Sequence, residues 1–267
     1  MKSACDVVIV VDNSPGGGEF GDVSGLVLLQ DGVNKGLGKA LNLGIRAAKE
    51  AGCAAVILFD QDSSPAASMI HELLRDAMSR GARTCVGPHL IDDALPHSTT
   101  GTMAGDMARE VRCLATSGML FPIDDLSEDD LFSEDLFLDF VDFDWCWRMR
   151  RKGWRIFRLE SAHMPHRLGI AQRRLLGLTY HVPAPYRHYF QFRDTLRLLK
   201  RGYVPTYAKF RLGLLLPAKL LAYPCILDHG GDRLRWMVRG IHDAFRGVTG
   251  VGAAAKKLLA VKADPAD

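Results

Sequence analysis

Two aspartates, Asp60 and Asp62, follow directly after an apolar run in the sequence VILFDQDSSP at residues 56–65. The apolar run predicts a buried strand, and the serines and proline after it predict a loop. Carboxylates one residue apart on such a loop supply the hard oxygen ligands that Mg²⁺ or Mn²⁺ takes together with water and phosphate oxygens. Aspartates that only cap a loop show the same spacing, so the pair by itself leaves both roles open.

Three further carboxylates, Asp139, Asp142 and Asp144, alternate with apolar residues in the sequence DFVDFDWCW at residues 139–147. Burial beside aromatic rings and repulsion between the carboxylates raise the pKa of at least one of them toward the range of a general base. A half-buried strand shows the same alternation of polar and apolar residues, so a structural role is the alternative.

A glycine-containing loop, NKGLGKALN at residues 34–42, leads into a predicted helix. Such a loop offers backbone N–H groups and a lysine to an anion. Its GxG is too short for a dinucleotide fingerprint, and no GK[ST] follows, so both of these nucleotide motifs are excluded.

The residues around these groups predict alternating strands and helices. Strands are expected at residues 7–11, 25–29, 54–59 and 84–86, and helices at residues 38–51 and 69–80. This alternation predicts an α/β fold with a mostly parallel sheet flanked by helices, in which ligands bind at the carboxyl ends of the strands. Asp12, Asp60 and Asp62 all follow such strand ends.

Charge divides the 267-residue chain into two unlike halves. Residues 1–145 carry 10 Lys and Arg against 24 Asp and Glu, whereas residues 146–267 carry 24 against 7. The basic half favours an anionic partner, unless it mainly pairs with the acidic half. The dense acidic stretch at residues 124–135 predicts a solvated loop or the start of a helix.

The apolar run at residues 212–227 is only sixteen residues long and contains a lysine and two prolines. It is therefore too short and broken for a membrane span, and it predicts either an interfacial helix or a buried one. The six cysteines form no CxxC pair, which argues against a zinc–thiolate site and a disulfide framework.

Taken together, these motifs resemble glycosyltransferase family 2, and within it the bacterial rhamnosyltransferase-like branch. The resemblance runs from about residue 6 to about residue 250 and keeps the order of the motifs. The segments that carry it are VVDNS at residues 10–14, NKGLGKALNLG at 34–44, LFDQDSSP at 58–65, ATSGMLF at 115–121, VDFDWCWRMRRKGW at 141–154 and VPAPYRHYFQFRDTLRLLKRGY at 182–203.

The resemblance implies a GT-A type fold that binds a nucleotide-diphospho sugar, with Asp142 as the catalytic base. It implies a Mg²⁺ or Mn²⁺ ion held by Asp60 and Asp62, with His166 near the metal. The residues implied to bind substrate are Asp12, Asn34, Lys39 and Asn42 on the nucleotide side, Asp60 at the diphosphate, Ser117 and Gly118 on the acceptor side, and Asp144, Trp145 and Arg148 in support of the base.

Members of this family usually begin with a strand and a helix before the VVDNS element, whereas six residues precede Val7 here. We therefore expect one interior strand to be missing, which leaves ladder groups unpaired on its two neighbours. The expected domains are a catalytic domain at residues 1–170 and a helical, basic C-terminal region at residues 171–267 on the acceptor and membrane side.

The expected reaction is an inverting transfer of a sugar, rhamnose from dTDP-rhamnose, to a lipid-linked or polysaccharide acceptor in cell-surface glycan synthesis. A UDP-sugar is the alternative donor. We expect a cytoplasmic protein, peripheral on the inner face of the cell membrane, without a nucleic-acid partner. The basic residues expected to meet the carrier diphosphate are Arg187, Arg193, Lys200 and Arg201.

Two other functions fit part of the pattern. A haloacid dehalogenase-type phosphatase would use Asp60 as its nucleophile, with Ser64 in place of the usual threonine or valine. That chemistry makes no use of the motifs around Asp12 and Asn34. An inactive relative that binds a membrane or a partner through its basic half is the other alternative.

Overall fold

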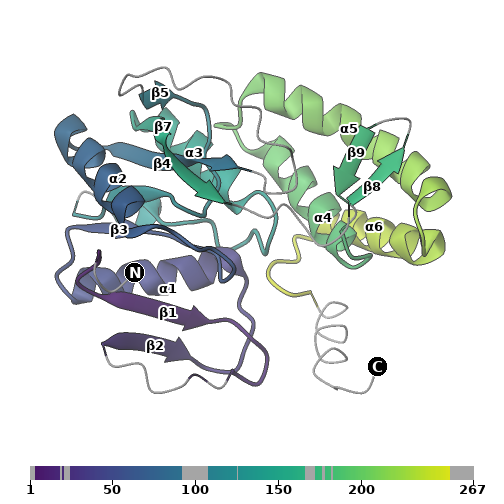
Figure 1. The fold of residues 1–267 in the computed structure, drawn as a ribbon. Coiled ribbons are helices and arrows are strands. Elements are labelled where there is room, and N and C mark those ends of the chain that lie inside the picture. The colour runs from purple at the N-terminus through teal and green to yellow at the C-terminus, as the bar shows by residue number, and fades with distance from the viewer. Residues whose placement is uncertain are drawn as a thin grey trace.

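The structure is a computed structural model of the full chain, and it describes residues 4–18, 20, 25–91, 108–124, 126–165, 172–175, 178–181 and 183–252. An α/β part formed by the first 165 residues lies beside a group of helices formed by the last third of the chain (Figure 1). The α/β class predicted from the alternating pattern is confirmed.

The main sheet has five strands in the order β3–β6–β4–β7–β5. Their bounds are Ala55–Ile57 for β3, Leu120–Pro122 for β6, Thr84–Ile91 for β4, Arg155–Pro165 for β7 and Ala108–Glu110 for β5. Only β4 and β7 pair in parallel, because β6 inserts between β3 and β4 and runs opposite to both. The expectation of a mostly parallel sheet is therefore corrected to a mixed sheet.

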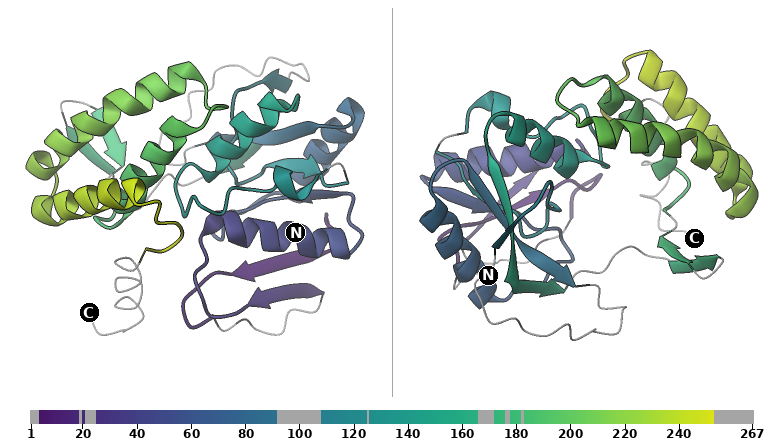
Figure 2. Two further views of the ribbon diagram at one scale, coloured as in Figure 1. Left: turned by 180° about the vertical axis from the view of Figure 1, so that it is seen from behind. Right: turned by 90° about the horizontal axis from the view of Figure 1, so that it is seen from above.

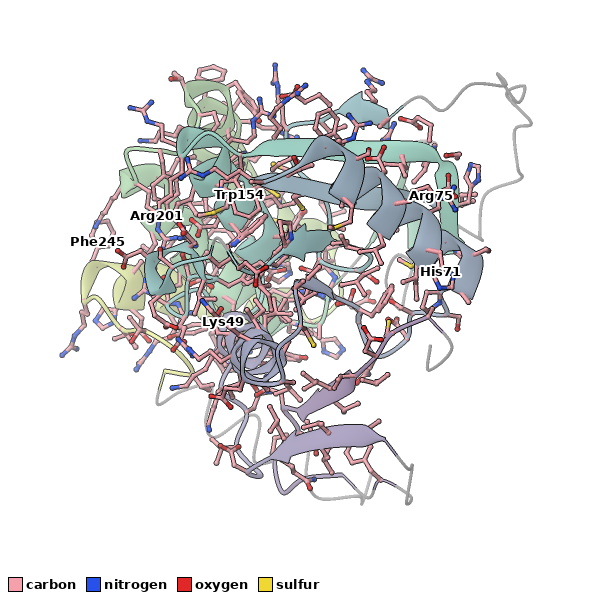
Figure 3. All side chains as sticks on the ribbon, turned by 90° about the vertical axis from the view of Figure 1, so that its left-hand side faces the viewer. Lys49, His71, Arg75, Trp154, Arg201 and Phe245 are labelled. Carbon is pink, nitrogen blue, oxygen red and sulfur yellow. The ribbon has the colours of Figure 1, made fainter. Side chains whose placement is uncertain are left out.

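Three helices belong to the α/β part: α1 (Leu37–Glu50), α2 (Ala67–Arg80) and α3 (Val141–Arg151). In α2 the buried residues Met69, Leu73 and Ala77 recur at helical spacing and face the sheet, because every fourth position lies on one side of a helix. His71 and Arg75 lie on its outer side (Figure 3). The helices predicted at residues 38–51 and 69–80 are confirmed, with ends shifted by one or two residues.

The first two strands, β1 (Val8–Asp12) and β2 (Leu26–Gln30), form a parallel pair of their own. Among the described residues, β1 and β3 are edge strands of two separate sheets. Ile9 on β1 and Val56 on β3 nevertheless pack against the same hydrophobic core. The sheet is thus interrupted between β1 and β3, and each of these strands has one edge that no described strand pairs.

The C-terminal helices are α4 (Arg187–Lys200), α5 (Thr206–Ile226) and α6 (Gly230–Phe245), which pack against one another beside the α/β part (Figure 2). A short hairpin, β8 (Gln172–Leu175) and β9 (Leu178–His181), precedes them. Gly240 lets α6 approach α4 closely, because a Cβ there would lie 2.4 Å from the Tyr189 carbonyl oxygen. In the described part of the chain, no helix combines the length and the hydropathy needed to cross a bilayer.

The helices and the α/β part share one core. Leu198, Val204 and Ala208 from the helical part are buried in the same cluster as Trp145 and Ile156. The packing therefore joins both regions in one hydrophobic core. The division into a catalytic domain at residues 1–170 and a C-terminal region at residues 171–267 stays a prediction.

Candidate active site

The aspartate pair lies at the carboxyl end of β3. The chain continues beside residues 118 and 119 after the strand ends, since Leu58 N donates to Met119 O at 2.9 Å and Leu58 O accepts from Gly118 N at 2.7 Å. A turn closed by Ser63 N and Asp60 O, 3.1 Å apart, follows. Asp60 is half-buried on the inner side of this turn, and Asp62 is exposed on it. The predicted position of both carboxylates at a strand end is confirmed.

Ser117 and Gly118 lie against the same turn. The hydroxyl oxygens of Ser117 and Ser63 are 2.5 Å apart, which ties the two loops together. Gly118 has a φ of +85°, and a Cβ on it would lie 2.5 Å from the Pro88 ring, so only glycine fits this position. Ser117 and Gly118 thus lie against the loop that carries Asp60, and their contact with an acceptor stays a prediction.

Asp142 lies in the first turn of α3, not on a strand as its alternating sequence also allowed. The residue before the helix, Phe140, has a φ of +67°, an uncommon left-handed conformation for a bulky side chain. This turn starts α3 directly after Asp139 and brings Asp142 close to Asp60. Burial raises the pKa of Asp142 to about 6, and the negative charges of Asp139 and Asp60 add to the shift. Asp142 is therefore a carboxylate that ionises near neutral pH, as a general base requires.

A group of cations faces these carboxylates from the C-terminal helices. Arg187 at the start of α4 binds Asp139 through two nitrogens, at 2.9 and 3.1 Å. Burial raises the pKa of Asp139, and the charges of Arg187 and Lys219 oppose that rise. Burial also lowers the pKa of Lys219 on α5, and Asp139 acts against this. The site thus combines the carboxylates of the α/β part with cations supplied by the helical part.

The neighbours of Asp142 on α3 have a different role from the one predicted. Asp144 is fully buried and accepts hydrogen bonds from Ser133 Oγ at 2.5 Å, Tyr203 OH at 2.7 Å and Arg201 Nη1. Because its oxygens are all engaged inside the protein, Asp144 fixes α3 to the helical part and does not contact a substrate. The predicted substrate contact of Asp144 is corrected to a positioning role.

Trp145 and Arg148 receive the same correction. Trp145 is fully buried, and its Nε1 donates to Asp130 O at 2.8 Å. The guanidinium of Arg148 donates to the carbonyl oxygens of Asp129 and Leu131. Both side chains therefore hold the acidic stretch against α3, and they support the base only through the position of the helix. The stretch was expected to be a solvated loop or the start of a helix; it contains a short 3₁₀ helix at Glu128–Asp130, and its buried residues anchor it to α3.

Asp12, at the end of β1, holds the loop that follows it. Its carboxylate accepts hydrogen bonds from Ser14 N at 2.9 Å, Gly18 N at 2.6 Å and Gln30 Nε2 at 2.7 Å. Hydrogen bonds from the side chain of Ser14 and the backbone N–H of Gly18 lower the pKa of Asp12 to about 2. Asp12 is therefore ionised at all ordinary pH values and shapes its loop, while a contact with a nucleotide stays a prediction.

Asn34 and Lys39 border a pocket of about 400 Å³ whose other walls are Lys35, Glu134, Asp135 and residues 249–251. Asn34 accepts a hydrogen bond from Gly36 N at 3.0 Å and so shapes the glycine loop. The lining residues do not include Asp60 or Asp142. The pocket provides room beside the glycine loop for a ligand, and the nucleotide role of Asn34 and Lys39 remains a prediction.

Asn42 does not border this pocket. Its side chain is buried in α1, where Nδ2 donates to Phe132 O at 3.0 Å and Oδ1 accepts from Phe132 N at 2.8 Å. A second bond joins Nδ2 to Glu134 Oε1 at 3.0 Å. The predicted contact of Asn42 with the nucleotide is therefore corrected, because the amide is used to attach α1 to the acidic stretch.

The chemistry of the donors fits a divalent cation in part. Asp60 and Asp62 offer hard carboxylate oxygens, and the negative charges of Asp139 and Asp60, which add to the effect of burial on the pKa of Asp142, favour a bound cation. Among the described residues, no group of three or more His, Cys, Asp or Glu side chains is arranged to hold a metal ion. His166 lies outside the described residues. A cation here would thus take its remaining ligands from water and from a phosphate-bearing substrate.

Two residues of the site were not predicted from the sequence. Asp139 was recognised only as a neighbour of the base, and Lys219 only as an interruption of an apolar run. The position of Lys219 is itself a signal in the sequence, because a lysine within an apolar helix needs a polar neighbour.

Three of the four basic residues expected at a carrier diphosphate contact other groups. Arg193 pairs with Asp194, Arg201 pairs with Asp144 and Asp135, and Lys200 lies over the Phe245 ring.

The chain is similar to known glycosyltransferases. It is 26% identical to the dTDP-rhamnosyl transferase RfbF of Shigella flexneri over 271 aligned residues, which cover 94% of this chain and 90% of that protein. No protein-family model matches the chain. The resemblance to the rhamnosyltransferase-like branch of glycosyltransferase family 2 is confirmed by the similarity to this protein.

Two solved structures are also similar. One is GalNAc-T7 with UDP, GalNAc and Mn²⁺, at a TM-score of 0.45 and 12% identity over 84% of this chain and 46% of that chain. The other is the mannosyltransferase PcManGT from Pyrobaculum calidifontis in complex with GDP-Man and Mn²⁺, at a TM-score of 0.43 and 16% identity over 89% of this chain and 62% of that chain. The chain spans less than two thirds of either solved protein.

Proposed function

We propose that this protein is an inverting glycosyltransferase with a GT-A type fold, which transfers a sugar from a nucleoside-diphosphate donor to an acceptor hydroxyl. The observation that carries the proposal is Asp142, a desolvated carboxylate with a pKa of about 6 that lies near Asp60. The similarity of nearly the whole chain to a dTDP-rhamnosyl transferase supports a sugar nucleotide as donor. We propose dTDP-rhamnose as that donor.

The arrangement divides the chemistry between two groups of side chains. Asp142 accepts the proton of the acceptor hydroxyl as its oxygen attacks the anomeric carbon, and a single base on one face leads to inversion. Asp60 and Asp62 would hold a Mg²⁺ or Mn²⁺ ion at the donor diphosphate. When bound, such an ion neutralises the charge that develops on the leaving diphosphate. A general acid is then not required, and the reaction does not need the second catalytic carboxylate that glycosidases use.

Ser117 and Gly118 lie beside the turn that carries Asp60, and this supports their assignment to the acceptor side. Arg187 and Lys219 add positive charge next to Asp139 on the same side. A phosphate group of a lipid-linked acceptor would complement these two cations. We therefore propose a lipid-linked glycan acceptor, and a protein that works in the cytoplasm on the inner face of the cell membrane.

The proposal is tested by Asp142→Asn. This change removes the proton acceptor and keeps the size of the side chain, so the transfer rate should fall by about 10²–10⁴-fold. Donor binding should persist, measured as the thermal shift caused by dTDP with Mn²⁺. Asp129→Asn is the matched control, because Asp129 is an exposed carboxylate on the acidic stretch, and it should keep full activity.

The outcome decides between the possible roles of the site. Loss of donor binding in Asp142→Asn would move this residue to the donor side and remove the base from the mechanism. Asp60→Asn and Asp62→Asn should both reduce the thermal shift that Mn²⁺ adds to that of dTDP. Trapping of a beryllofluoride adduct on Asp60 would instead establish the phosphatase chemistry and contradict the proposal.

A further inference from the structure

The outer side of α5 carries a row of exposed apolar side chains. Tyr207, Phe210, Leu214 and Leu221 are spaced by three, four and seven residues, so they share one face of the helix. We call these four residues the α5 stripe. Phe210 is 74% exposed and Leu221 is 75% exposed. A contiguous row of exposed apolar side chains is uncommon on the surface of a soluble protein.

The opposite face of α5 is anchored in the protein. Ala208 is buried in the main core, and Leu212 packs against the same cluster. Lys219, also on this inner face, lies near Asp139 at the candidate active site. The helix is therefore held in place from one side, and the orientation of the α5 stripe toward solvent is fixed by that packing.

The charge of α5 indicates what covers the stripe. The helix contains Lys209, Arg211 and Lys219 and no Asp or Glu, so its formal charge is +3. Arg211 is exposed beside the stripe, and the guanidinium of Arg112 lies 4.5 Å from the centre of the Tyr207 ring. Two copies of this chain that paired through the stripe would bring these like charges together, which disfavours a symmetric dimer.

Exposed apolar residues next to cations are complementary to the surface of a bilayer whose headgroups are anionic. Pro217 and Pro224 interrupt the helix, and helix α5 is not suited to cross the membrane. On α6, Val238 and Phe245 add further exposed apolar side chains, and Phe245 lies at the edge of the molecule (Figure 3).

We propose that the α5 stripe docks on the surface of an anionic lipid bilayer. The inference deepens the proposed function, on which it rests for the acceptor, by naming the face that meets the carrier membrane. Since Lys219 and the stripe lie on opposite faces of one helix, docking holds the carboxylate site one helix away from the headgroups.

The test is co-sedimentation of the full chain with vesicles, without any donor or acceptor. The protein should bind vesicles of phosphatidylcholine mixed with phosphatidylglycerol, bind phosphatidylcholine alone weakly, and lose binding as salt rises. The double variant Phe210→Glu/Leu221→Glu should lower the partition coefficient by about tenfold or more, because two large side chains no longer enter the interface.

Two further variants keep the test specific. Phe210→Ser/Leu221→Ser removes the apolar surface without adding negative charge, and it should also weaken binding. Met78→Glu places a charge on a side chain of α2 that is 65% exposed, and it should bind like the unchanged protein. Circular dichroism and thermal unfolding check that each variant is folded.

Several results would overturn the proposal. It fails if the unchanged protein binds neither kind of vesicle, or if Met78→Glu weakens binding as much as the double variant does. It also fails if the unchanged protein forms a dimer that the double variant abolishes. Vesicle binding in the absence of transfer activity would leave docking in place and count against the proposed function, so the two can fail separately.

Discussion

Two carboxylates, Asp12 at the end of β1 and Asp142 in the first turn of α3, have opposite surroundings. Asp12 accepts hydrogen bonds from three donors, and its pKa falls to about 2. Asp142 accepts one from the neighbouring Phe143 N at 2.8 Å, is buried beside other negative charges, and has a pKa of about 6. Hydrogen-bond donors decide whether such a carboxylate stabilises the fold or remains reactive.

The same rule separates two residues on a single helix. Asp144 is two positions after Asp142 and is fully buried, yet Ser133, Tyr203 and Arg201 supply donors to it. Burial raises the pKa of Tyr203 to about 12, and the negative charge of Asp144 adds to this shift. A buried carboxylate with partners serves the structure, and one that lacks such partners is available for chemistry.

The largest expected effect on stability comes from Asp144→Asn. This change leaves Arg201 without its buried partner, and removing one member of such a pair costs about 3–5 kcal/mol. The exposed Asp135 still binds Arg201 at 2.6 Å, so we expect the lower end of this range. Urea unfolding measures the loss.

Asp142→Asn is the matched comparison for that measurement, since it makes the same change two residues away. It should leave the unfolding free energy unchanged or raise it slightly, because it removes a desolvated charge. If Asp142→Asn destabilised the protein as much as Asp144→Asn, both residues would be structural and the contrast between them would be lost.

A smaller loss of stability is expected for Asp12→Asn, which weakens the acceptor for Ser14, Gly18 and Gln30. Because the folded pKa of Asp12 is about 2 and its ordinary value is 3.8, its ionised form favours folding above that ordinary value. This contribution disappears as the pH falls toward 2. The melting temperatures of the unchanged protein and the variant should therefore converge in acid, and a constant difference would contradict the assignment.

The smallest effect is a dependence of the transfer rate on pH. Asp142 accepts a proton only when ionised, so the rate should fall about tenfold for each pH unit below a midpoint near 6. Above that midpoint the rate should not change with the ionisation of Asp142. Rate measurements between acid and neutral pH test this dependence, and a midpoint near 4 would show that Asp142 is solvated and contradict its assignment as a desolvated base.

The local elements were predictable from the sequence because their causes are local. The helical spacing of Met69, Leu73 and Ala77 predicts α2, and the apolar run before Asp60 predicts β3 and places the two aspartates at its end. The three-residue strand β6 was missed, because Leu120–Pro122 has no alternation long enough to identify a strand. Its insertion between β3 and β4 is what makes the sheet mixed.

Which of the neighbouring polar residues remain available for chemistry was not predictable from the sequence. Asn42 and Asp144 fit the motifs as well as Asp142 does, but their partners Phe132 and Arg201 lie 90 and 57 residues away. Hydrogen-bond satisfaction depends on donors that arrive from other elements. A sequence motif shows which residue is present, but it does not show how many hydrogen-bond partners that residue has in the folded protein.

The sequence alone determined the strands and helices of the first 91 residues, the aspartates at the end of β3 and the resemblance to glycosyltransferases, since each of these depends on neighbouring residues. Only the tertiary structure decided that Asp142 is desolvated, that Arg187 and Lys219 lie beside Asp139, and that α5 exposes an apolar face. Burial and long-range charge are sums over the whole fold, and they exist only once distant segments have packed together.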